Sequence, residues 1–322
     1  MKNLEIEIKQ INRIAGRRES CLYDVLKTIA AYLNIRADNI YINEFGFSFN
    51  YEEYNKSGLI GKSIKQNPNR VLENLKLLYG YDLQYSYFKS FEEELVYINN
   101  CLAINFPAIV QFDSFYLPWD PFNNRVHNNH VVLITGIDEN NVNVVDPYFN
   151  KKNKIMSIES LKEASTFYMY FNEKKADFSE INFKQLLIDN YVNKYKTPSS
   201  NYLDLEFFSR AILTDFSVEK EFTESVFDQN AIFKNLSDCV LRTGLFYEII
   251  DYHNSIEKSK TLILIKDELK KIVKNWNDII TLIASNNFQT KIKNTKQIAE
   301  LISDLAIKYE DILLKIKTYV NE

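Results

Sequence analysis

The stretch that decides the fold is His130-Val-Val-Leu-Ile-Thr-Gly-Ile-Asp-Glu-Asn-Asn-Val-Asn-Val-Val-Asp146. Two runs of β-forming residues flank the polar segment from Asp138 to Asn141, a pattern typical of a β-hairpin. Gly136 is the expected position of a β-bulge. The hairpin begins on a histidine and ends on an aspartate, and a bulge would let these two side chains approach on one face.

A helix is expected to start at Cys21. Apolar residues recur at spacings of three and four from Cys21 to Leu33, as on one face of a helix. Ser20 is a candidate N-cap, and Asp24 falls in the first turn, where the helix dipole favours an acid. The thiol of Cys21 is therefore expected at a helix N-terminus, an environment that favours the thiolate.

These three residues match the parts of a papain-like cysteine site. Taken alone, Cys21 reads as a small buried side chain, His130 as an edge polar residue and Asp146 as a turn aspartate before Pro147. Together they supply a nucleophile, a base and a carboxylate that orients the base. We therefore predict that Cys21, His130 and Asp146 form a catalytic triad for acyl transfer through an enzyme-bound thioester.

The remaining histidine and cysteine spacings do not favour a metal. His127 and His130 form an i, i+3 pair, but no third or fourth ligand accompanies them. The cysteines at positions 21, 101 and 239 lie far apart, which indicates neither a disulfide framework nor a zinc site. We expect no metal and no resident cofactor.

Composition narrows the class of protein. The 322 residues are 46% hydrophobic and 25% charged, which is ordinary for a globular chain. A net charge of -4 gives no reason to expect a nucleic-acid partner. Met1 to Ser20 has no apolar run of signal-peptide length, and no later segment approaches a membrane span. We expect a cytoplasmic protein without a membrane partner.

Periodicity divides the chain into two predicted domains, a mixed catalytic domain over residues 1–175 and an all-α domain over residues 176–322. The overall class is therefore predicted to be α+β, with an antiparallel sheet in the first domain. Its expected strands are Leu83–Phe88, Ala108–Phe112, Val131–Ile137, Val142–Val145 and Phe167–Phe171, and its later helices are Arg70–Tyr79 and Phe91–Ile104. The expected helices of the second domain are 203–215, 229–252, 259–284 and 292–319, and the candidate linker is 196–201.

Several separated motifs carry a resemblance to a known family. They are Cys21 ahead of a helix, Asn43-Glu-Phe-Gly46, Asp113-Ser-Phe-Tyr-Leu-Pro-Trp119, the segment His130–Asp138, and Val144-Val-Asp146-Pro147. In this order they resemble the N-terminal domain of butirosin biosynthesis protein H, over about residues 15 to 150. That family looks like a branch of the C39-type papain-like cysteine peptidases, with a helical region after the catalytic domain.

The resemblance implies an amide-forming acyltransferase of specialised-metabolite biosynthesis. Such an enzyme takes an acyl group from the phosphopantetheine thioester of an acyl or peptidyl carrier protein, stores it on Cys21 and transfers it to a small amine. It is similar to the protease homologue that forms amides in closthioamide-type thiotemplated assembly. The resemblance also implies that Asp113, Tyr116, Trp119 and Glu44 contact substrate.

One position departs from the C39 pattern. Those peptidases carry a glutamine several residues before the cysteine as an oxyanion donor, where this chain has Ala15, and Gln10 lies further upstream. The backbone N–H of Cys21 is one candidate donor, and the second is not identified. Loss of a donor puts peptide hydrolysis in doubt more than thioester chemistry, because a thioester is already activated.

Two alternatives remain open. The same triad suits a cysteine peptidase or amidase, and a degenerate site suits a non-catalytic protein that binds a ligand or a carrier protein. Arg17, Arg18 and Lys27 are candidate contacts for an acidic carrier protein, although surface charges of this kind usually serve solvation.

Overall fold

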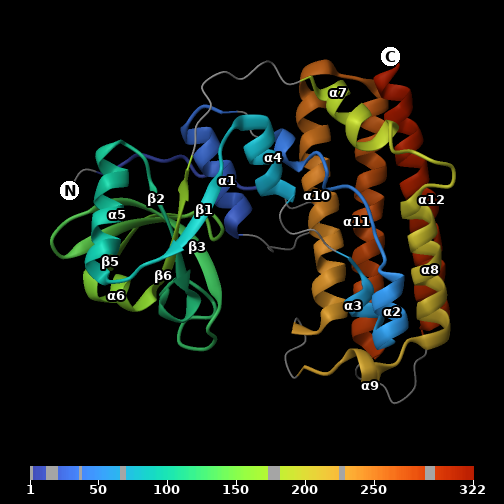
Figure 1. Cartoon of the computed structure of the whole chain (residues 1–322), viewed down its shortest axis with the longest axis horizontal. Coiled ribbons are helices and arrows are strands. Elements are labelled where there is room, and N and C mark those ends of the chain that lie inside the picture. The colour runs from blue at the N-terminus through green and yellow to red at the C-terminus, as the bar shows by residue number, and fades with distance from the viewer. Residues whose placement is uncertain are drawn as a thin grey trace. The chain divides into compact units, whose positions relative to one another are not determined.

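The computed structural model describes residues 3–11, 21–35, 38–65, 70–172, 182–224, 229–286 and 294–322. Within those ranges the chain forms two compact units. The sheet unit comprises residues 3–11, 21–38 and 72–172, and the helical unit comprises residues 39–71 and 182–322. The class is α+β, as predicted (Figure 1).

The sheet unit contains a six-stranded antiparallel sheet in the order β1-β6-β2-β3-β4-β5. The strands are β1 (Leu83–Tyr87), β2 (Ala108–Asp113), β3 (Asn129–Ile137), β4 (Asn141–Asp146), β5 (Lys151–Ser157) and β6 (Ser165–Phe171). The five expected strands are confirmed. β5 was not predicted, because it is an edge strand rich in lysine, and charged edges lack the apolar alternation of a half-buried strand.

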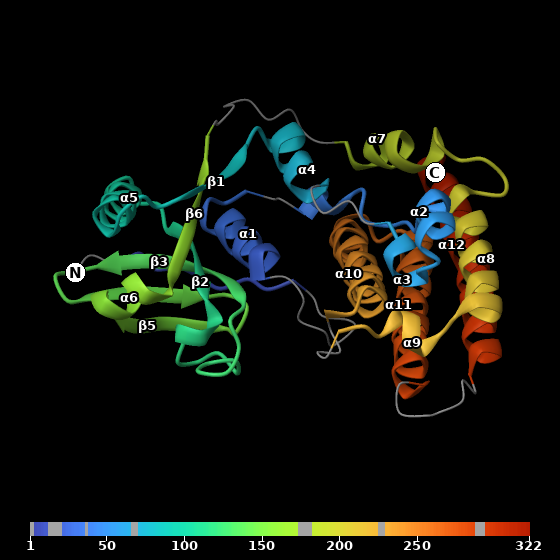
Figure 2. The same cartoon turned by 60° about the horizontal axis from the view of Figure 1, so that its bottom comes forward.

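Helices of the sheet unit are α1 (Cys21–Tyr32), α4 (Arg70–Tyr79), α5 (Phe91–Ala103) and α6 (Ile158–Ala164), together with the short 3-10 helix η2 (Ser114–Tyr116). A further 3-10 helix, η1 (Asp38–Tyr41), lies where the two units meet along the chain. α1 packs against β3, and α5 packs against β2 and β3 (Figure 2). Alternate residues of the central strands, such as Val110, Val132 and Val144, are fully buried in one apolar core. This core holds the hairpin of β3 and β4 in place.

The predicted hairpin is confirmed in detail. β3 and β4 pair in antiparallel register, and the register shifts between Ile134 and Gly136, where the bulge was expected. The connecting turn is closed by Asp138, whose Oδ1 accepts hydrogen bonds from the backbone N–H groups of Asn140 and Asn141. An aspartate that bonds backbone groups ahead of it in this way is a common turn former.

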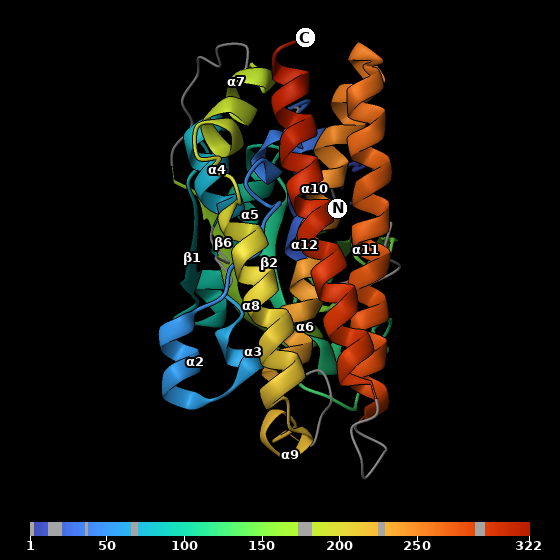
Figure 3. The ribbon, with the colours of Figure 1, turned by 90° about the vertical axis from the view of Figure 1, so that its right-hand side faces the viewer.

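The helical unit is built on four long helices. They are α8 (Ser200–Asp215), α10 (Ala231–Glu257), α11 (Lys260–Asn286) and α12 (Thr295–Val320), and they confirm the four expected helices. α12 packs against α8 and α11, and α11 packs against α10 (Figure 3). Shorter helices complete the unit: α2 (Tyr51–Ser57), α3 (Ile60–Ser63), α7 (Phe183–Leu187), the π-helix η3 (Ile188–Val192) and α9 (Val218–Glu221).

Residues 39–71 pack into the helical unit, which the division into 1–175 and 176–322 did not anticipate. The ring of Phe45 stacks on Phe246 and Tyr309, with centroids 5.3 and 4.6 Å apart, and Phe47 stacks on Trp276. These aromatic residues belong to the core of the helical unit. The attachment depends on contacts across some two hundred residues of chain, which local periodicity does not report.

Residues 196–201 were predicted to link the two domains, but they lie within the helical unit. They connect η3 to α8, and Ser199 caps α8 by accepting a hydrogen bond from the backbone N–H of Tyr202. Across the described ranges, none of the helices combines the length and the apolar character that crossing a bilayer requires.

Candidate active site

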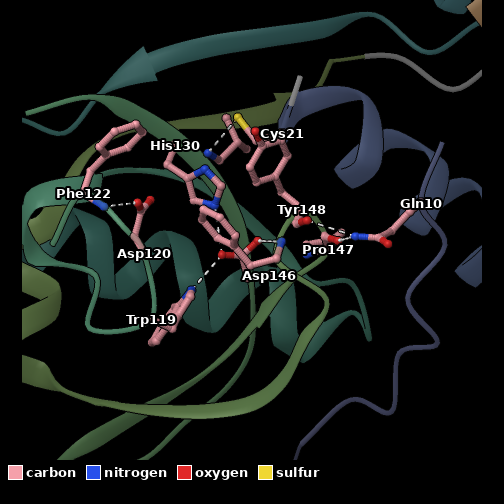
Figure 4. A network of polar contacts seen from close by, with 11 residues as sticks. Gln10, Cys21, Trp119, Asp120, Phe122, His130, Asp146, Pro147 and Tyr148 are labelled. Carbon is pink, nitrogen blue, oxygen red and sulfur yellow. Dashed lines mark hydrogen bonds and ion pairs between the residues drawn. The ribbon is translucent and has the colours of Figure 1, made fainter. Parts of the chain in front are cut away.

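Cys21 occupies the first residue of α1 and is half-buried. Its Sγ accepts a hydrogen bond from the backbone N–H of Val131, 3.4 Å away (Figure 4). The hairpin register pairs Leu133 with Val145, so the next facing pair on that side would join Val131 to Pro147. β4 ends at Asp146, before that pair. The N–H of Val131 therefore serves the sulfur instead of the ladder.

His130 lies between the sulfur and the carboxylate, and only 4% of it is exposed. Its Nε2 is 2.9 Å from Oδ2 of Asp146, and the neighbouring backbone N–H of Val131 bonds to the sulfur of Cys21. Burial alone lowers the pKa of His130, but the hydrogen bonds and charges of Asp146 and Cys21 outweigh it and raise this pKa to about 10. An imidazolium at neutral pH is the form that stabilises a neighbouring thiolate.

Asp146 is fully buried and receives three hydrogen bonds. Oδ2 accepts from His130 and from the indole Nε1 of Trp119 at 2.7 Å, and Oδ1 accepts from the backbone N–H of Phe149 at 3.1 Å. A buried carboxylate needs such donors, because unpaired polar atoms in the interior are costly. The three donors fix the carboxylate in the orientation that holds the His130 ring.

The segment after Asp146 is held by Gln10. The side-chain Nε2 of Gln10 donates to the carbonyl oxygens of Pro147 and Tyr148, at 2.5 and 2.9 Å (Figure 4). The rings of Tyr148 and Phe149 lie 5.4 and 5.2 Å from the imidazole of His130. Gln10 thus fixes the aromatic residues that flank His130, and its amide is bound to these two carbonyls.

Three of the residues expected to contact substrate have defined partners in the sheet unit. Oδ2 of Asp113 lies 2.6 Å from Nδ1 of His127, and Oδ1 caps η2 by accepting from the backbone N–H of Phe115. Tyr116 is half-buried against the core of the sheet unit. Trp119 directs its indole N–H at Asp146. A substrate-binding role for Asp113 and Tyr116 stays a prediction, whereas the bond from Trp119 to Asp146 had no signal in the sequence.

Glu44, the fourth expected substrate contact, belongs to the helical unit. Its carboxylate is 2% exposed and accepts a hydrogen bond from Nε of Arg242 at 2.8 Å. Burial raises the pKa of Glu44, and Arg242 opposes that rise. The structure thus brings Cys21, His130 and Asp146 together within the sheet unit, while Glu44 is part of a separate buried ion pair.

The basic residues proposed near the site are only partly described. Arg17 and Arg18, the N-cap candidate Ser20 and the substituted position Ala15 lie outside the described residues. Lys27 is half-buried on α1.

The two histidines considered for metal binding, His127 and His130, each contact a different carboxylate. His127 pairs with Asp113, and His130 pairs with Asp146. In the described part of the chain, no group of three or more His, Cys, Asp or Glu side chains is arranged to hold a metal ion.

A protein-family model matches part of the chain. No curated protein matches the chain. The matching family model covers the segment that contains Trp119, His130 and Asp146, and it starts after Cys21. Residues 42–147 match the family described as butirosin biosynthesis protein H, N-terminal. This is the family that the sequence motifs resemble, and it is named for a biosynthetic protein.

Proposed function

We propose that the protein is an amide-forming acyltransferase of natural-product biosynthesis with a papain-like site. It takes an acyl group from a carrier-protein thioester, holds it on Cys21 and transfers it to a small amine. The observation that carries this proposal is the position of His130, whose Nε2 lies 2.9 Å from Oδ2 of Asp146 and whose pKa is raised by both Asp146 and Cys21.

The first half-reaction exchanges one thioester for another. The Cys21 thiolate attacks the carbonyl carbon of the acyl-phosphopantetheine thioester, and a new C–S bond forms. The bond from that carbon to the phosphopantetheine sulfur breaks, and the leaving thiolate takes the proton carried by His130. The raised pKa of His130 keeps that proton available at neutral pH.

The second half-reaction needs His130 as a base. The amine nitrogen attacks the acyl group on Cys21, His130 accepts the amine proton, and the C–S bond to Cys21 breaks to give the amide. Acylation removes the sulfur charge and the hydrogen bond that raise the pKa of His130. This pKa therefore falls in the acyl-enzyme, and the imidazole becomes able to accept a proton when aminolysis requires it.

The lack of a glutamine oxyanion donor near the sulfur favours acyl transfer from a thioester over peptide hydrolysis. Ala15 stands in place of the oxyanion glutamine, and the amide of Gln10 is bound to the Pro147 and Tyr148 carbonyls. Loss of one oxyanion donor typically costs about 10²- to 10³-fold in rate. An activated thioester tolerates that loss better than an amide. His130 is also only 4% exposed, which limits the access of water to the ring.

The partners follow from this chemistry. The acyl donor is an acyl or peptidyl carrier protein whose phosphopantetheine supplies the thioester, and the acceptor is a small amine. The match of residues 42–147 to a biosynthetic family supports this assignment.

The test follows the acyl group by intact-protein mass spectrometry. Wild-type protein is incubated with acyl-loaded carrier protein and then with an amine. We expect an acyl adduct on Cys21 that the amine chases into an amide, no adduct in Cys21→Ala, and a normal adduct in the matched control Cys101→Ala. Amide formation by Cys21→Ala at the wild-type rate would overturn the proposal. Release of free acid from peptides, with no dependence on the amine, would make the protein a hydrolase instead.

A further inference from the structure

The helical unit contains a cavity of about 500 Å³ that the proposed reaction does not use. Its wall is formed by the segment around Asn43 to Ser48, the start of α8 and the segment after η3. We call it the cationic cavity, because the charged side chains that line it are Lys65, Arg70, Lys194, Arg242 and Asp204. Its volume lies within the range typical of sites for small molecules.

The positive charge of this cavity is only partly balanced. Arg242 is paired with Glu44 at 2.8 Å and with Asp238 at 3.4 Å. Of the other cations, Lys65 interacts electrostatically with Asp204, and Arg70 interacts with Glu44, the same carboxylate that pairs with Arg242. This concentration of cations is local, since the whole chain carries a net charge of -4.

Asp204 is itself engaged by other groups. Its Oδ1 accepts a hydrogen bond from the Tyr51 hydroxyl at 2.6 Å, and its Oδ2 accepts from the backbone N–H of Phe49 at 3.2 Å. These bonds fix the carboxylate to the loop that carries both residues. Asp204 therefore supports the wall of the cavity and also interacts with Lys65.

The wall formed by Asn43 to Ser48 is held in place from two sides. Nη1 of Arg70 donates to the carbonyl oxygen of Asn43 at 2.8 Å, and Oδ1 of Asn201 accepts from the backbone N–H of Phe47 at 2.7 Å. Gly46 has a φ of +156°, and a Cβ at this position would lie 3.3 Å from Oδ1 of Asn201. The Asn43-Glu-Phe-Gly46 motif, which the acyl-transfer site leaves unused, thus builds one wall of the cationic cavity.

We propose that the cationic cavity binds a small molecule that carries a phosphate group. Arg70 supplies a planar guanidinium, which suits the oxygens of a phosphate, and Lys65 and Lys194 supply point charges for a dianion. Ser48, Ser200 and Asn201 add hydroxyl and amide groups for the rest of the ligand. This site is separate from Cys21 and does not depend on acyl transfer.

Isothermal titration calorimetry of the full chain tests the proposal with inorganic phosphate and glycerol phosphate as probes. We expect saturable binding of both, and about tenfold weaker binding in Lys65→Gln and in Lys194→Gln, because each variant removes one charge-assisted contact. Lys296→Gln, which changes an exposed lysine on α12 away from the cavity, should bind like the wild type. Cys21→Ala should also bind normally, which separates this test from that of the acyltransferase.

Three results would overturn the proposal. The first is no binding of either phosphate probe. The second is binding that both lysine substitutions leave unchanged. The third is tighter binding of succinate than of phosphate, which would make the cavity a dicarboxylate site.

Discussion

The two units each bury one histidine, and the two rings have opposite acid–base character. In the sheet unit, Asp146 and Cys21 outweigh burial and raise the pKa of His130 to about 10. In the helical unit, burial lowers the pKa of His253 to about 4. The ring of His253 stacks on Phe183, with centroids 3.6 Å apart, and its Nε2 bonds to the neutral amide oxygen of Asn39 at 3.0 Å.

The difference shows that burial does not make a histidine catalytic. His130 is 4% exposed and His253 is 9% exposed, so solvent access is similar. What differs is the partner: a carboxylate in one case and an amide in the other. The acid of Glu257 is also close to His253, but its Oε1 is 3.9 Å from Nδ1, beyond hydrogen-bond distance. A charged partner and an adjacent sulfur are what make His130 a candidate base.

The largest expected effect comes from giving His130 the kind of partner that His253 has. Asp146→Asn replaces the carboxylate with an amide, which neither stabilises the imidazolium nor enforces the useful tautomer. We expect the pKa of His130 to fall and the amide-forming rate to drop about 10⁴-fold, as for the equivalent change in other triads. NMR titration of the His130 ring and a rate assay on the same sample measure both. A variant that keeps the wild-type pKa and rate would break the comparison.

A smaller effect is expected from the residue that supports Asp146. Trp119→Phe keeps an aromatic ring and removes the hydrogen bond of 2.7 Å to Oδ2. A hydrogen bond to a charged group contributes about 1.5–3 kcal/mol, so we expect a rate at least roughly tenfold lower. The pH profile for the base should also shift, which a purely structural role would not produce. Tyr85→Phe, which changes an exposed side chain on β1 of the same unit, is the control and should keep the wild-type profile.

The smallest effect concerns the stability of the helical unit in acid. The folded pKa of His253, about 4, lies below its ordinary value of 6.5. Its contribution to stability is therefore present above pH 6.5 and is lost as the pH falls toward 4. For His130 the sign is reversed, because the contribution is complete below pH 6.5 and declines as the pH rises toward 10.

Chemical denaturation at a series of pH values tests whether His253 lowers the free energy of unfolding as the pH falls. His253→Asn should flatten the loss of unfolding free energy between pH 6.5 and pH 4, relative to the wild type. His130→Asn should leave that acid limb unchanged. Equal acid sensitivity in the wild type and in His253→Asn would contradict the role given to burial.

The site was more predictable from sequence than the division into units. Local sequence predicts the hairpin from His130 to Asp146, because two β-forming runs flank a turn that contains an aspartate. Local sequence also predicts the amphipathic helix that begins at Cys21. Trp119 and Gln10 gave no such signal, because their hydrogen bonds to the triad segment arise only when distant parts of the chain fold together. Residues 39–71 were assigned to the wrong unit for the same reason, since Phe45 finds its ring partners in α10 and α12.

The reactivity of the three thiols tests the central claim most directly. Brief treatment with iodoacetamide at neutral pH, followed by peptide mass spectrometry, compares Cys21 with Cys101 and Cys239 in one sample. Cys239 is buried, and burial raises the pKa of the Cys101 thiol, so both should react slowly. We expect Cys21 to be alkylated first in the folded protein, and to lose this advantage in His130→Ala. A Cys21 that reacts no faster than Cys101, or equally fast without His130, would contradict the pairing of sulfur and imidazole on which the proposed reaction depends.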